Sequence, residues 1–443
     1  MARDTIFALS SAAGRAAIAV IRVSGPAAAH AVRGLTGKEL PAPRFALYAR
    51  LRDPESGAAL DDGVVLWFPG PGSETGEDVA EFQIHGSRAT VGAVLEALAK
   101  IPGLRSAGPG EFTRRAFDNG KLDLTAVEGL ADLINSETEA QRLLALRQLR
   151  GELGRLYDGW RGRLMKILAH AEAEIDFPEE TAEPSFEKLD RGIVEIEAEI
   201  LGHLDDGRRG ERTRDGLSVA IVGAPNVGKS SLLNAIARRD VAIVSARAGT
   251  TRDVIEVHLD LAGYPVTLAD TAGIRASGDE IEIEGVRRAV ARAEDADLRL
   301  VVFDATRWPE TESGIVALAG MPSILVLNKI DLASDSVGTS FEGRALVPVS
   351  AKTGQGLSGL MEMLEREAVA LLGVSAAPTL TRIRHRKALE GCAAALRRST
   401  AAILPELKAE DLRLAMRELG RITGRVDIEA ILDIMFRDFC IGK

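Results

Sequence analysis

The chain has 443 residues and a mass of 47.1 kDa, and at about 150 residues per domain this length predicts three domains. Hydrophobic residues make up 46% and charged residues 27%, a balance that excludes a disordered chain. Lys and Arg number 55 against 65 Asp and Glu, a net charge of −10, which argues against nucleic-acid binding through bulk positive charge. The two cysteines, Cys392 and Cys440, exclude a disulfide scaffold and a four-thiolate zinc site.

The start of the chain has no features of a targeting segment. The first residues are Met-Ala-Arg-Asp-Thr, with an early acid and no apolar signal sequence behind them. No apolar run approaches the roughly 20 residues that span a bilayer. We therefore expect a soluble, cytoplasmic protein that does not associate with membranes.

Residues 1–118 contain short β-type runs, such as 17–23 and 64–68, separated by turn signals such as Pro-Gly-Pro-Gly at 69–72. This pattern predicts a compact α+β domain.

The next region, residues 119–215, has apolar residues three or four apart, which predicts helices. Its polar end, residues 205–210, is predicted to be a linker. Helical periodicity returns in residues 373–443. One discontinuous helical domain that contains an inserted unit is the favoured arrangement, and two separate helical domains are the alternative.

Residues 216–372 alternate short apolar strands with helical segments, which predicts a mostly parallel sheet covered by helices. The expected strands are 217–222, 266–269, 298–303, 324–327 and 346–349. Ligands of such sheets bind at the carboxyl ends of the strands.

A phosphate-binding loop follows the first of these strands. Residues 223–230 read Gly-Ala-Pro-Asn-Val-Gly-Lys-Ser, which fits G-x-x-x-x-G-K-S between a strand and a helical run at 231–237. Its backbone N–H groups are expected to surround phosphate oxygens at the helix N-terminus. Lys229 would contact the β- and γ-phosphates and Ser230 would bind Mg²⁺.

Three further motifs follow at later strand ends. Asp270 opens Asp-Thr-Ala-Gly, which places a carboxylate near Mg²⁺ and a flexible N–H near the γ-phosphate. Asp331 closes Asn-Lys-Ile-Asp and can accept hydrogen bonds from the N1–H and N2 amine of guanine, a donor pair that adenine lacks. Residues 350–352, Ser-Ala-Lys, complete a base pocket. Four motifs in this order predict a GTPase domain.

The position where Ras-like enzymes carry a water-orienting Gln is occupied by Ile274, which cannot hydrogen-bond to water. Either hydrolysis is slow or another group takes over. Asn226 could help to hold a monovalent cation against the phosphates. The acidic run 279–284 could position water, although such a run also suits a solvated helix start.

These motifs, with Gly-Thr-Thr-Arg-Asp at 249–253 and Phe-Cys-Ile-Gly-Lys at 439–443, resemble those of the MnmE/TrmE family of tRNA-modification GTPases. The resemblance extends over essentially the whole chain and includes residues 21–25, 75–78 and 109–124. It implies an α+β N-terminal domain for tetrahydrofolate binding and dimerisation, a discontinuous α-helical domain and an inserted α/β P-loop (Ras-like) G domain.

The resemblance also implies a function. Family members are homodimers that, with a flavoprotein of the MnmG/GidA type in a heterotetramer or larger complex, add a (carboxymethyl)aminomethyl-type group to C5 of wobble uridine 34 in certain tRNAs. Tetrahydrofolate donates the one-carbon unit, and FAD is held only by the partner. Their G domains dimerise around K⁺, and this dimerisation is coupled to modification.

Site residues are implied by the same resemblance, with Glu282 as the catalytic acid of hydrolysis. The matching K⁺ positions are Asn226, Ser245, Arg247 and Thr250. The Mg²⁺ positions are Ser230 and Thr251. The folate positions are Arg22, Glu81, Lys121 and Lys443. The GTP-binding positions are Asn226, Val227, Gly228, Lys229, Ser230, Ser231, Ser245, Ala246, Arg247, Ala248, Gly249, Thr250, Thr251, Asp270, Thr271, Ala272, Gly273, Asn328, Lys329, Asp331, Ser350, Ala351 and Lys352.

Two features of the carboxy-terminal region have two interpretations each. Residues 374–443 carry 13 Lys or Arg against 9 Asp or Glu, a local charge of +4. The run at 382–387 and the pair at 397–398 could neutralise tRNA phosphates or could form a solvated helix face. Cys440 could act as a nucleophile or pack as a small buried hydrophobe.

Two other functions remain open at this point. A ribosome-assembly GTPase with an RNA-binding appendage would share the GTPase motifs without needing Arg22, Glu81 and Lys121. A folate-sensing regulator would share the whole pattern without any modification activity.

Overall fold

The computed structural model describes residues 4–176, 186–239, 241–243, 256–270, 295–310, 322–333, 340–373, 377–426, 432, 435–436, 439 and 441–442. The chain forms two compact units. Unit one contains Met1–Ala131, Leu149–Lys166 and Arg413–Lys443, and unit two contains Asp132–Gln148 and Ile167–Leu412.

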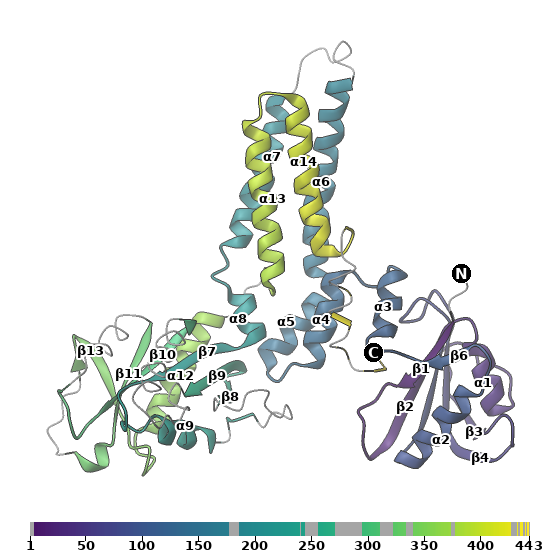
Figure 1. Ribbon diagram of the computed structural model, residues 1–443, viewed down its shortest axis with the longest axis horizontal. Coiled ribbons are helices and arrows are strands. Elements are labelled where there is room, and N and C mark those ends of the chain that lie inside the picture. The colour runs from purple at the N-terminus through teal and green to yellow at the C-terminus, as the bar shows by residue number, and fades with distance from the viewer. Residues whose placement is uncertain are drawn as a thin grey trace, which may run out of the picture. The chain divides into compact units, whose positions relative to one another are not determined.

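Unit one contains a six-stranded sheet in the order β3-β4-β5-β2-β1-β6, in which β1 and β6 are parallel and the other neighbours antiparallel. The strands are β1 Thr5–Leu9, β2 Ala16–Ser24, β3 Leu47–Arg52, β4 Ala59–Phe68, β5 Val79–Gly86 and β6 Leu104–Ser106. Helices α1 (Ala28–Thr36) and α2 (Arg88–Ala99) cover one face (Figure 1). Alternate strand residues, among them Ile21 and Phe82, pack beneath them.

Unit one also contains α3 (Glu111–Asp118) and most of α4 (Leu124–Ile134). Leu124 and Val127 of α4 pack with Leu432, Phe436 and Phe439. The C-terminal residues lie against the sheet, because Ile441 pairs with Pro109 and Ser10 Oγ donates a hydrogen bond of 2.9 Å to the carbonyl of Gly442. The two ends of the chain therefore meet within one unit.

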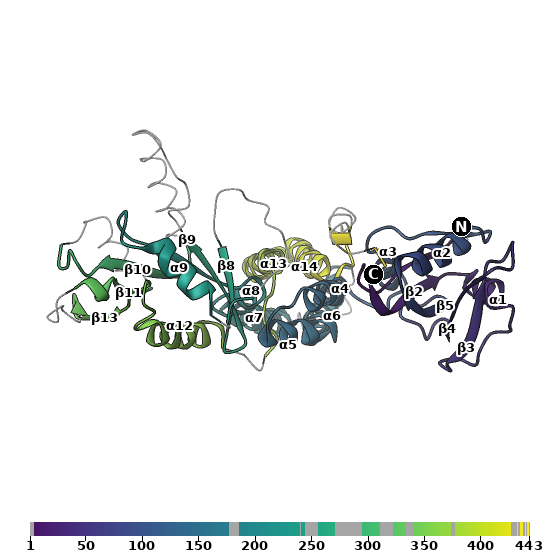
Figure 2. The same ribbon diagram turned by 90° about the horizontal axis from the view of Figure 1, so that it is seen from below.

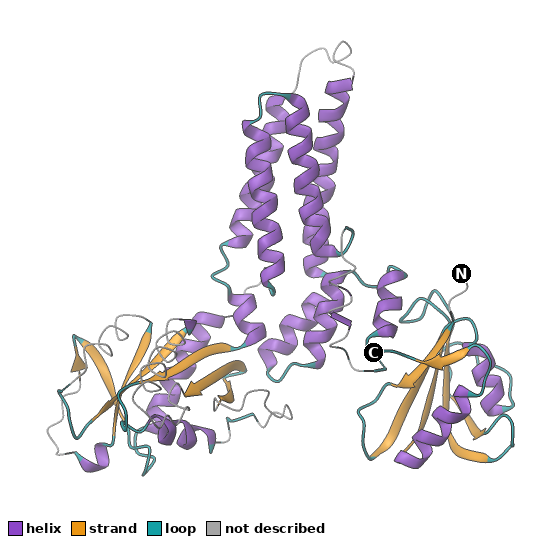
Figure 3. Ribbon diagram, in the orientation of Figure 1, coloured by secondary structure: helices purple, strands orange, loops and turns teal. Residues whose placement is uncertain are grey.

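Unit two contains a seven-stranded sheet in the order β12-β13-β11-β10-β7-β9-β8, with five central strands parallel (Figure 3). The strands are β7 Leu217–Val222, β8 Glu256–Leu261, β9 Tyr264–Asp270, β10 Leu298–Asp304, β11 Ser323–Asn328, β12 Ser340–Phe341 and β13 Arg344–Pro348. Because β9 and β10 lie on opposite sides of β7, the strand order reverses at β7, which is where ligands of such sheets bind.

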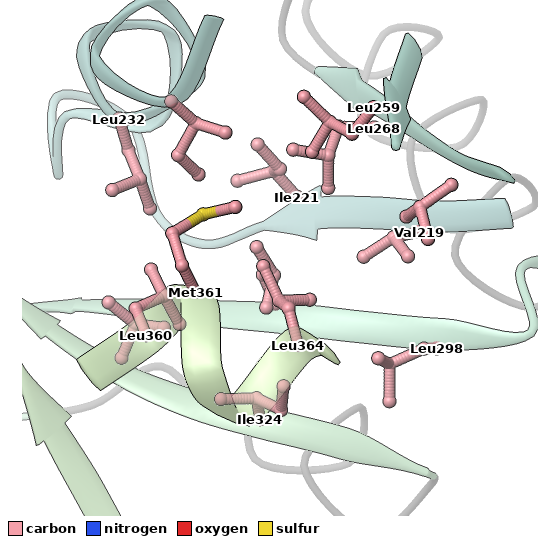
Figure 4. Close-up of a cluster of buried hydrophobic side chains, with 14 of the residues drawn as sticks. Val219, Ile221, Leu232, Leu259, Leu268, Leu298, Ile324, Leu360, Met361 and Leu364 are labelled. Carbon is pink, nitrogen blue, oxygen red and sulfur yellow. The ribbon is translucent and has the colours of Figure 1, made fainter. Parts of the chain in front are cut away.

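Helices α9 (Lys229–Ala237) and α12 (Leu357–Leu372) cover the same face of this sheet. Figure 4 shows Leu232 of α9 and Leu360 and Leu364 of α12 gathered with Ile221 and Val219 of β7. On the opposite face, Phe303, Trp308 and Phe341 form an aromatic cluster with ring centroids 5.4–5.7 Å apart.

The helices outside the two sheets match the predicted helical regions. They are α5 (Glu139–Leu149), α6 (Glu152–Asp176), α7 (Phe186–Leu204), α8 (Arg209–Asp215), α13 (Ile383–Ala401) and α14 (Pro405–Thr423). In unit two α7 packs against α13 (Figures 1 and 2), and the Glu197–Arg397 ion pair of 2.9 Å joins them.

All five predicted strands of the 216–372 region are present, whereas the predicted linker is shorter than expected. Residues 209–210 begin α8 instead, since the Glu211 carboxylate is held by Arg386 at 3.2 Å and the helix packs closely on residues 379–380. The edge strands β8 and β12 were not predicted. The division into domains at 118, 215 and 372 stays a prediction.

The packing of α8 gives a stability prediction. A Cβ on Gly210 would lie 2.1 Å from the carbonyl oxygen of Leu380, so Gly210→Ala must displace backbone. We expect it to destabilise unit two by about 1–3 kcal/mol. Gly202, in the exposed face of α7, has nothing within 4 Å of its Cβ position, so Gly202→Ala is the control and should stabilise by up to about 1 kcal/mol. Thermal unfolding of both variants checks this, and equal midpoints would contradict it.

Candidate functional site

The phosphate loop joins β7 to α9 at the carboxyl edge of the sheet. Asn226 and Gly228 adopt the left-handed conformation, with φ of 63° and 95°. Glycine is required at 228 for a second reason, because a Cβ there would lie 2.4 Å from Asn328 Nδ2. The loop therefore has the compact turn that directs backbone N–H groups toward a bound phosphate at the start of α9.

Lys229 is buried at the start of α9, and its ammonium lies on the loop itself. Its Nζ donates hydrogen bonds to the carbonyls of Gly223 at 2.8 Å and Ala224 at 2.9 Å. A phosphate oxygen is a stronger acceptor for an ammonium than a neutral carbonyl. The predicted contact with β- and γ-phosphates would therefore replace these carbonyl acceptors with stronger ones.

Ser230, a predicted magnesium ligand, and Asp270, whose carboxylate was predicted to lie near Mg²⁺, are brought together. Ser230 Oγ donates a hydrogen bond to the Asp270 carboxylate, which is almost fully buried at the end of β9. A hydroxyl and one carboxylate, with phosphate oxygens and water, form the oxygen-rich set that Mg²⁺ prefers. Among the described residues no group of three or more His, Cys, Asp or Glu is arranged to hold a metal ion.

Asn328 links the phosphate loop to the base pocket. Its side chain is 1% exposed. Nδ2 donates to the carbonyl of Val227 at 2.9 Å, and Oδ1 accepts from the backbone N–H of Ala351 at 3.0 Å. These two hydrogen bonds join the phosphate loop to the base loop.

Asp331 remains exposed beside Asn328. Ser350 Oγ donates a hydrogen bond of 2.6 Å to Asp331 Oδ1 and accepts one from the N–H of Thr353 at 3.1 Å. This orients the carboxylate while leaving acceptor capacity for the two donors of guanine. Lys352 is exposed at the edge of the pocket.

Lys329 makes contacts that connect the base loop to the predicted cation position. Its Nζ donates to the carbonyl of Asn226 at 2.6 Å and to Asp304 Oδ2 at 2.7 Å. Burial raises the pKa of the Asp304 carboxyl, but hydrogen bonds from Lys329 and Thr306 outweigh it and hold that pKa below its usual value. Asp304 was not predicted as a site residue.

Several predicted site residues lie outside the described residues. They are Ser245, Ala246, Arg247, Ala248, Gly249, Thr250, Thr251, Thr271, Ala272, Gly273, Glu282 and Lys443, together with Cys440. Their roles stay predictions.

In unit one, Arg22 and Glu81 face each other across β2 and β5. Arg22 donates to Glu81 Oε1 from Nε at 3.0 Å and from Nη2 at 2.9 Å, and its Nη1 lies 2.5 Å from Glu74. The guanidinium also lies 5.9 Å from the centroid of the Phe112 ring. Both side chains of the pair are 17% exposed, so a ligand can reach them.

Lys121 and Arg22 both contact the loop that follows β4. Its Nζ donates to the carbonyl of Pro71 at 2.9 Å, and Asn119 Nδ2 donates to that of Thr75 at 2.7 Å. The same loop supplies Glu74, the second partner of Arg22. Glu74 was missed because nothing in its sequence context marks it.

Four basic residues of the two predicted runs, Arg382, Arg386, Arg397 and Arg398, have carboxylate partners within unit two. Arg382 pairs with Asp132 at 2.8 Å and Arg386 with Asp206 at 2.8 Å, while Arg398 pairs with Asp411 at 2.9 Å. With the Arg397 pair described above, this favours a structural role for these arginines over phosphate neutralisation.

Cys392 is buried. No described helix is both long and apolar enough to cross a bilayer.

Comparisons with known proteins agree with this arrangement. Residues 5–121 match the family model "GTP-binding protein TrmE N-terminus" and residues 124–440 match "MnmE helical domain". A tRNA modification GTPase MnmE of Parvibaculum lavamentivorans is 58% identical over 99% of this chain and 100% of its own length. The human mitochondrial 5-taurinomethyluridine-[tRNA] synthase subunit GTPB3 is 50% identical over 99% of this chain and 93% of its own length.

Among solved structures, Aquifex aeolicus Era bound to GDP·AlF₄⁻ matches 42% of this chain and 69% of that chain, with 27% identity and a TM-score of 0.27. The family models span both the N-terminal and the helical regions, and the relatives match from end to end. The chain therefore belongs to the MnmE/TrmE family of tRNA-modification GTPases.

Proposed function

We propose that this chain hydrolyses GTP to drive addition of a (carboxymethyl)aminomethyl-type group to C5 of wobble uridine 34 in certain tRNAs, in the cytoplasm. The observation that carries the proposal is the 50% identity, over 99% of the chain, to a human protein named for making 5-taurinomethyluridine in tRNA. In that nucleoside one added carbon joins C5 of uracil to an amine. The same two ingredients, a one-carbon unit and an amine, would produce the group proposed here.

We infer that tetrahydrofolate supplies the carbon and is held by Arg22, Glu81, Lys121 and Lys443. A carboxylate such as Glu81 can pair with the amidine-like edge of a pterin, and cations can meet the glutamate tail. The Arg22–Glu81 pair supports this, because it fixes a partly exposed carboxylate and guanidinium before any ligand arrives. A bound tetrahydrofolate would contribute the one-carbon unit.

The chain is proposed to work as a homodimer with a flavoprotein of the MnmG/GidA type that carries the FAD. The sheet face opposite α1 and α2 supports dimerisation, since Ile18 is 61% and Tyr48 69% exposed there. Phe112 of α3 covers part of this face, and exposed apolar side chains on the remainder suit a surface that another chain covers.

We propose that GTP and K⁺ favour a closed pair of G domains and that hydrolysis releases it. Asn226, Ser245, Arg247 and Thr250 would hold K⁺, and Ser230 and Thr251 would hold Mg²⁺. Asn226 suits this role, because its backbone carbonyl is fixed by Lys329 while its side-chain amide oxygen is a hard donor. Glu282 would position the attacking water, a task that Ile274 cannot perform.

The proposed function predicts the nucleosides of tRNA. In cells that lack this gene, C5-aminomethyl uridines at the wobble position should disappear, and the wild-type gene should restore them. Mass spectrometry of wobble nucleosides measures this. An unchanged profile would leave a GTPase without this pathway, and a ribosome-assembly role would then be favoured.

The proposed water-positioning role of Glu282 predicts a separation of binding from hydrolysis. Glu282→Ala should bind GTP normally while hydrolysis falls by about 100-fold or more. Glu280→Ala, two residues away in the same acidic run, is the matched control and should hydrolyse GTP at the wild-type rate. Unchanged turnover in Glu282→Ala would remove this residue from the mechanism.

The orientation of Asp331 by Ser350 predicts a change of base specificity. Asp331→Asn replaces an acceptor for the guanine donors with an amide that matches the carbonyl and N–H of xanthine. Affinity for GTP should fall by about 100-fold or more while affinity for XTP rises. Competition binding with both nucleotides measures this, and loss of GTP without gain of XTP would indicate a damaged pocket instead.

A further inference from the structure

Asp304 closes a chain of contacts that ends at the proposed potassium position. It is the last residue of β10, and its Oδ2 accepts a hydrogen bond of 2.7 Å from Lys329 Nζ. The same ammonium donates at 2.6 Å to the backbone carbonyl of Asn226. One carboxylate, one ammonium and one carbonyl thus connect the end of β10 to the turn of the phosphate loop.

The surroundings hold Asp304 in place. Thr306 donates to Asp304 Oδ1 from its backbone N–H at 2.9 Å and from Oγ1 at 2.7 Å. The N–H of Ala305 donates to the carbonyl of Asn328 at 2.8 Å, which ties the ends of β10 and β11 together. Phe303, which precedes Asp304, and Trp308, which follows it, pack edge to face with ring centroids 5.4 Å apart. The carboxylate therefore has one well-defined position, from which it can fix Lys329.

The charges of Lys329 and Asp304 affect a cation that binds near Asn226. Lys329 brings a positive charge to the carbonyl of Asn226, and a second cation bound beside that loop would be repelled by it. The Asp304 side chain is 9% exposed and that of Lys329 is 30% exposed, so water screens the pair only in part. In the described part of the chain, Asp304 is the carboxylate that forms an ion pair with Lys329, and it balances this charge.

We propose that Asp304 is a positioning residue for K⁺: it neutralises Lys329 and holds it against the Asn226 carbonyl, which fixes the left-handed turn that presents the Asn226 amide. This inference rests on the proposed potassium role of Asn226. Asp304 contacts neither nucleotide nor cation in this scheme. Its removal should therefore weaken the response to K⁺ more than the selection of guanine, which depends on Asp331.

The test uses the full chain with Asp304→Asn, which removes the charge and keeps the side-chain size. Asp297→Asn is the matched control, because Asp297 precedes the same strand and pairs with a different cation, Arg212, at 2.7 Å. Potassium replaces sodium at constant ionic strength. Two potassium concentrations are measured. The first gives half of the maximal stimulation of GTP hydrolysis. The second gives half of the maximal rise in thermal unfolding midpoint of the protein loaded with Mg²⁺, GDP and aluminium fluoride.

For Asp304→Asn both half-saturation concentrations should rise by about fivefold or more, while Asp297→Asn should stay within about twofold of wild type. Equal shifts in both variants, or no shift in Asp304→Asn, would overturn the inference. If Asp304→Asn does not fold, Thr306→Val at an exposed position removes one hydrogen bond to Asp304 and should give a smaller shift in the same direction; no shift there would also overturn it.

The wild-type protein separates this inference from the proposed function. A wild-type protein that responds to K⁺ while Asp304→Asn responds identically would sink only the role of Asp304. A wild-type protein whose hydrolysis and thermal midpoint ignore K⁺ would sink the potassium part of the proposed function, and the role of Asp304 with it.

Discussion

The buried amide of Asn328 is the interaction on which the nucleotide site depends. Its two hydrogen bonds, to Val227 at 2.9 Å and from Ala351 at 3.0 Å, join loops that are more than 120 residues apart along the chain. A buried amide that loses such a partner costs about 1–3 kcal/mol, so each loop stabilises the position of the other. Gly228 is part of the same constraint, because only a residue without Cβ lets the phosphate loop approach this amide.

The strand order explains why these loops meet. Since β7 lies between β9 and β10, the phosphate loop after β7 has the Asp270 strand on one side and the Asp304 and Asn328 strands on the other. All of these residues end parallel strands and therefore reach the same edge of the sheet. Because the motifs lie at these strand ends, short side chains and backbone groups are enough to contact the phosphates, the metal ion and the base.

Much of this arrangement could be predicted from the sequence, because the central strands are continuous apolar runs and the motifs follow them. The edge strand β8, Glu-Val-His-Leu-Asp-Leu, does alternate polar and apolar residues as a half-buried strand does, but the strand prediction rested on continuous apolar runs, which mark only strands buried on both faces. Asp304 was missed because a single acid after a strand marks no motif. From the residues alone Arg22 and Lys121 were not distinguishable from ordinary surface residues, and Arg22 and Glu81 are 59 residues apart. Their pairing depends on the register of β2 and β5, which local pattern does not specify.

The two proposed sites prepare their charges in opposite ways. Lys229 donates to two backbone carbonyls, and a charged phosphate oxygen forms a stronger hydrogen bond with an ammonium than a carbonyl does. Arg22 already has two carboxylates as partners, so an anionic ligand gains little by replacing them and must instead use the groups that the pair orients. The nucleotide site therefore offers an ammonium that gains stronger acceptors when phosphate binds, whereas the proposed folate site offers charges that are already paired and that orient a ligand.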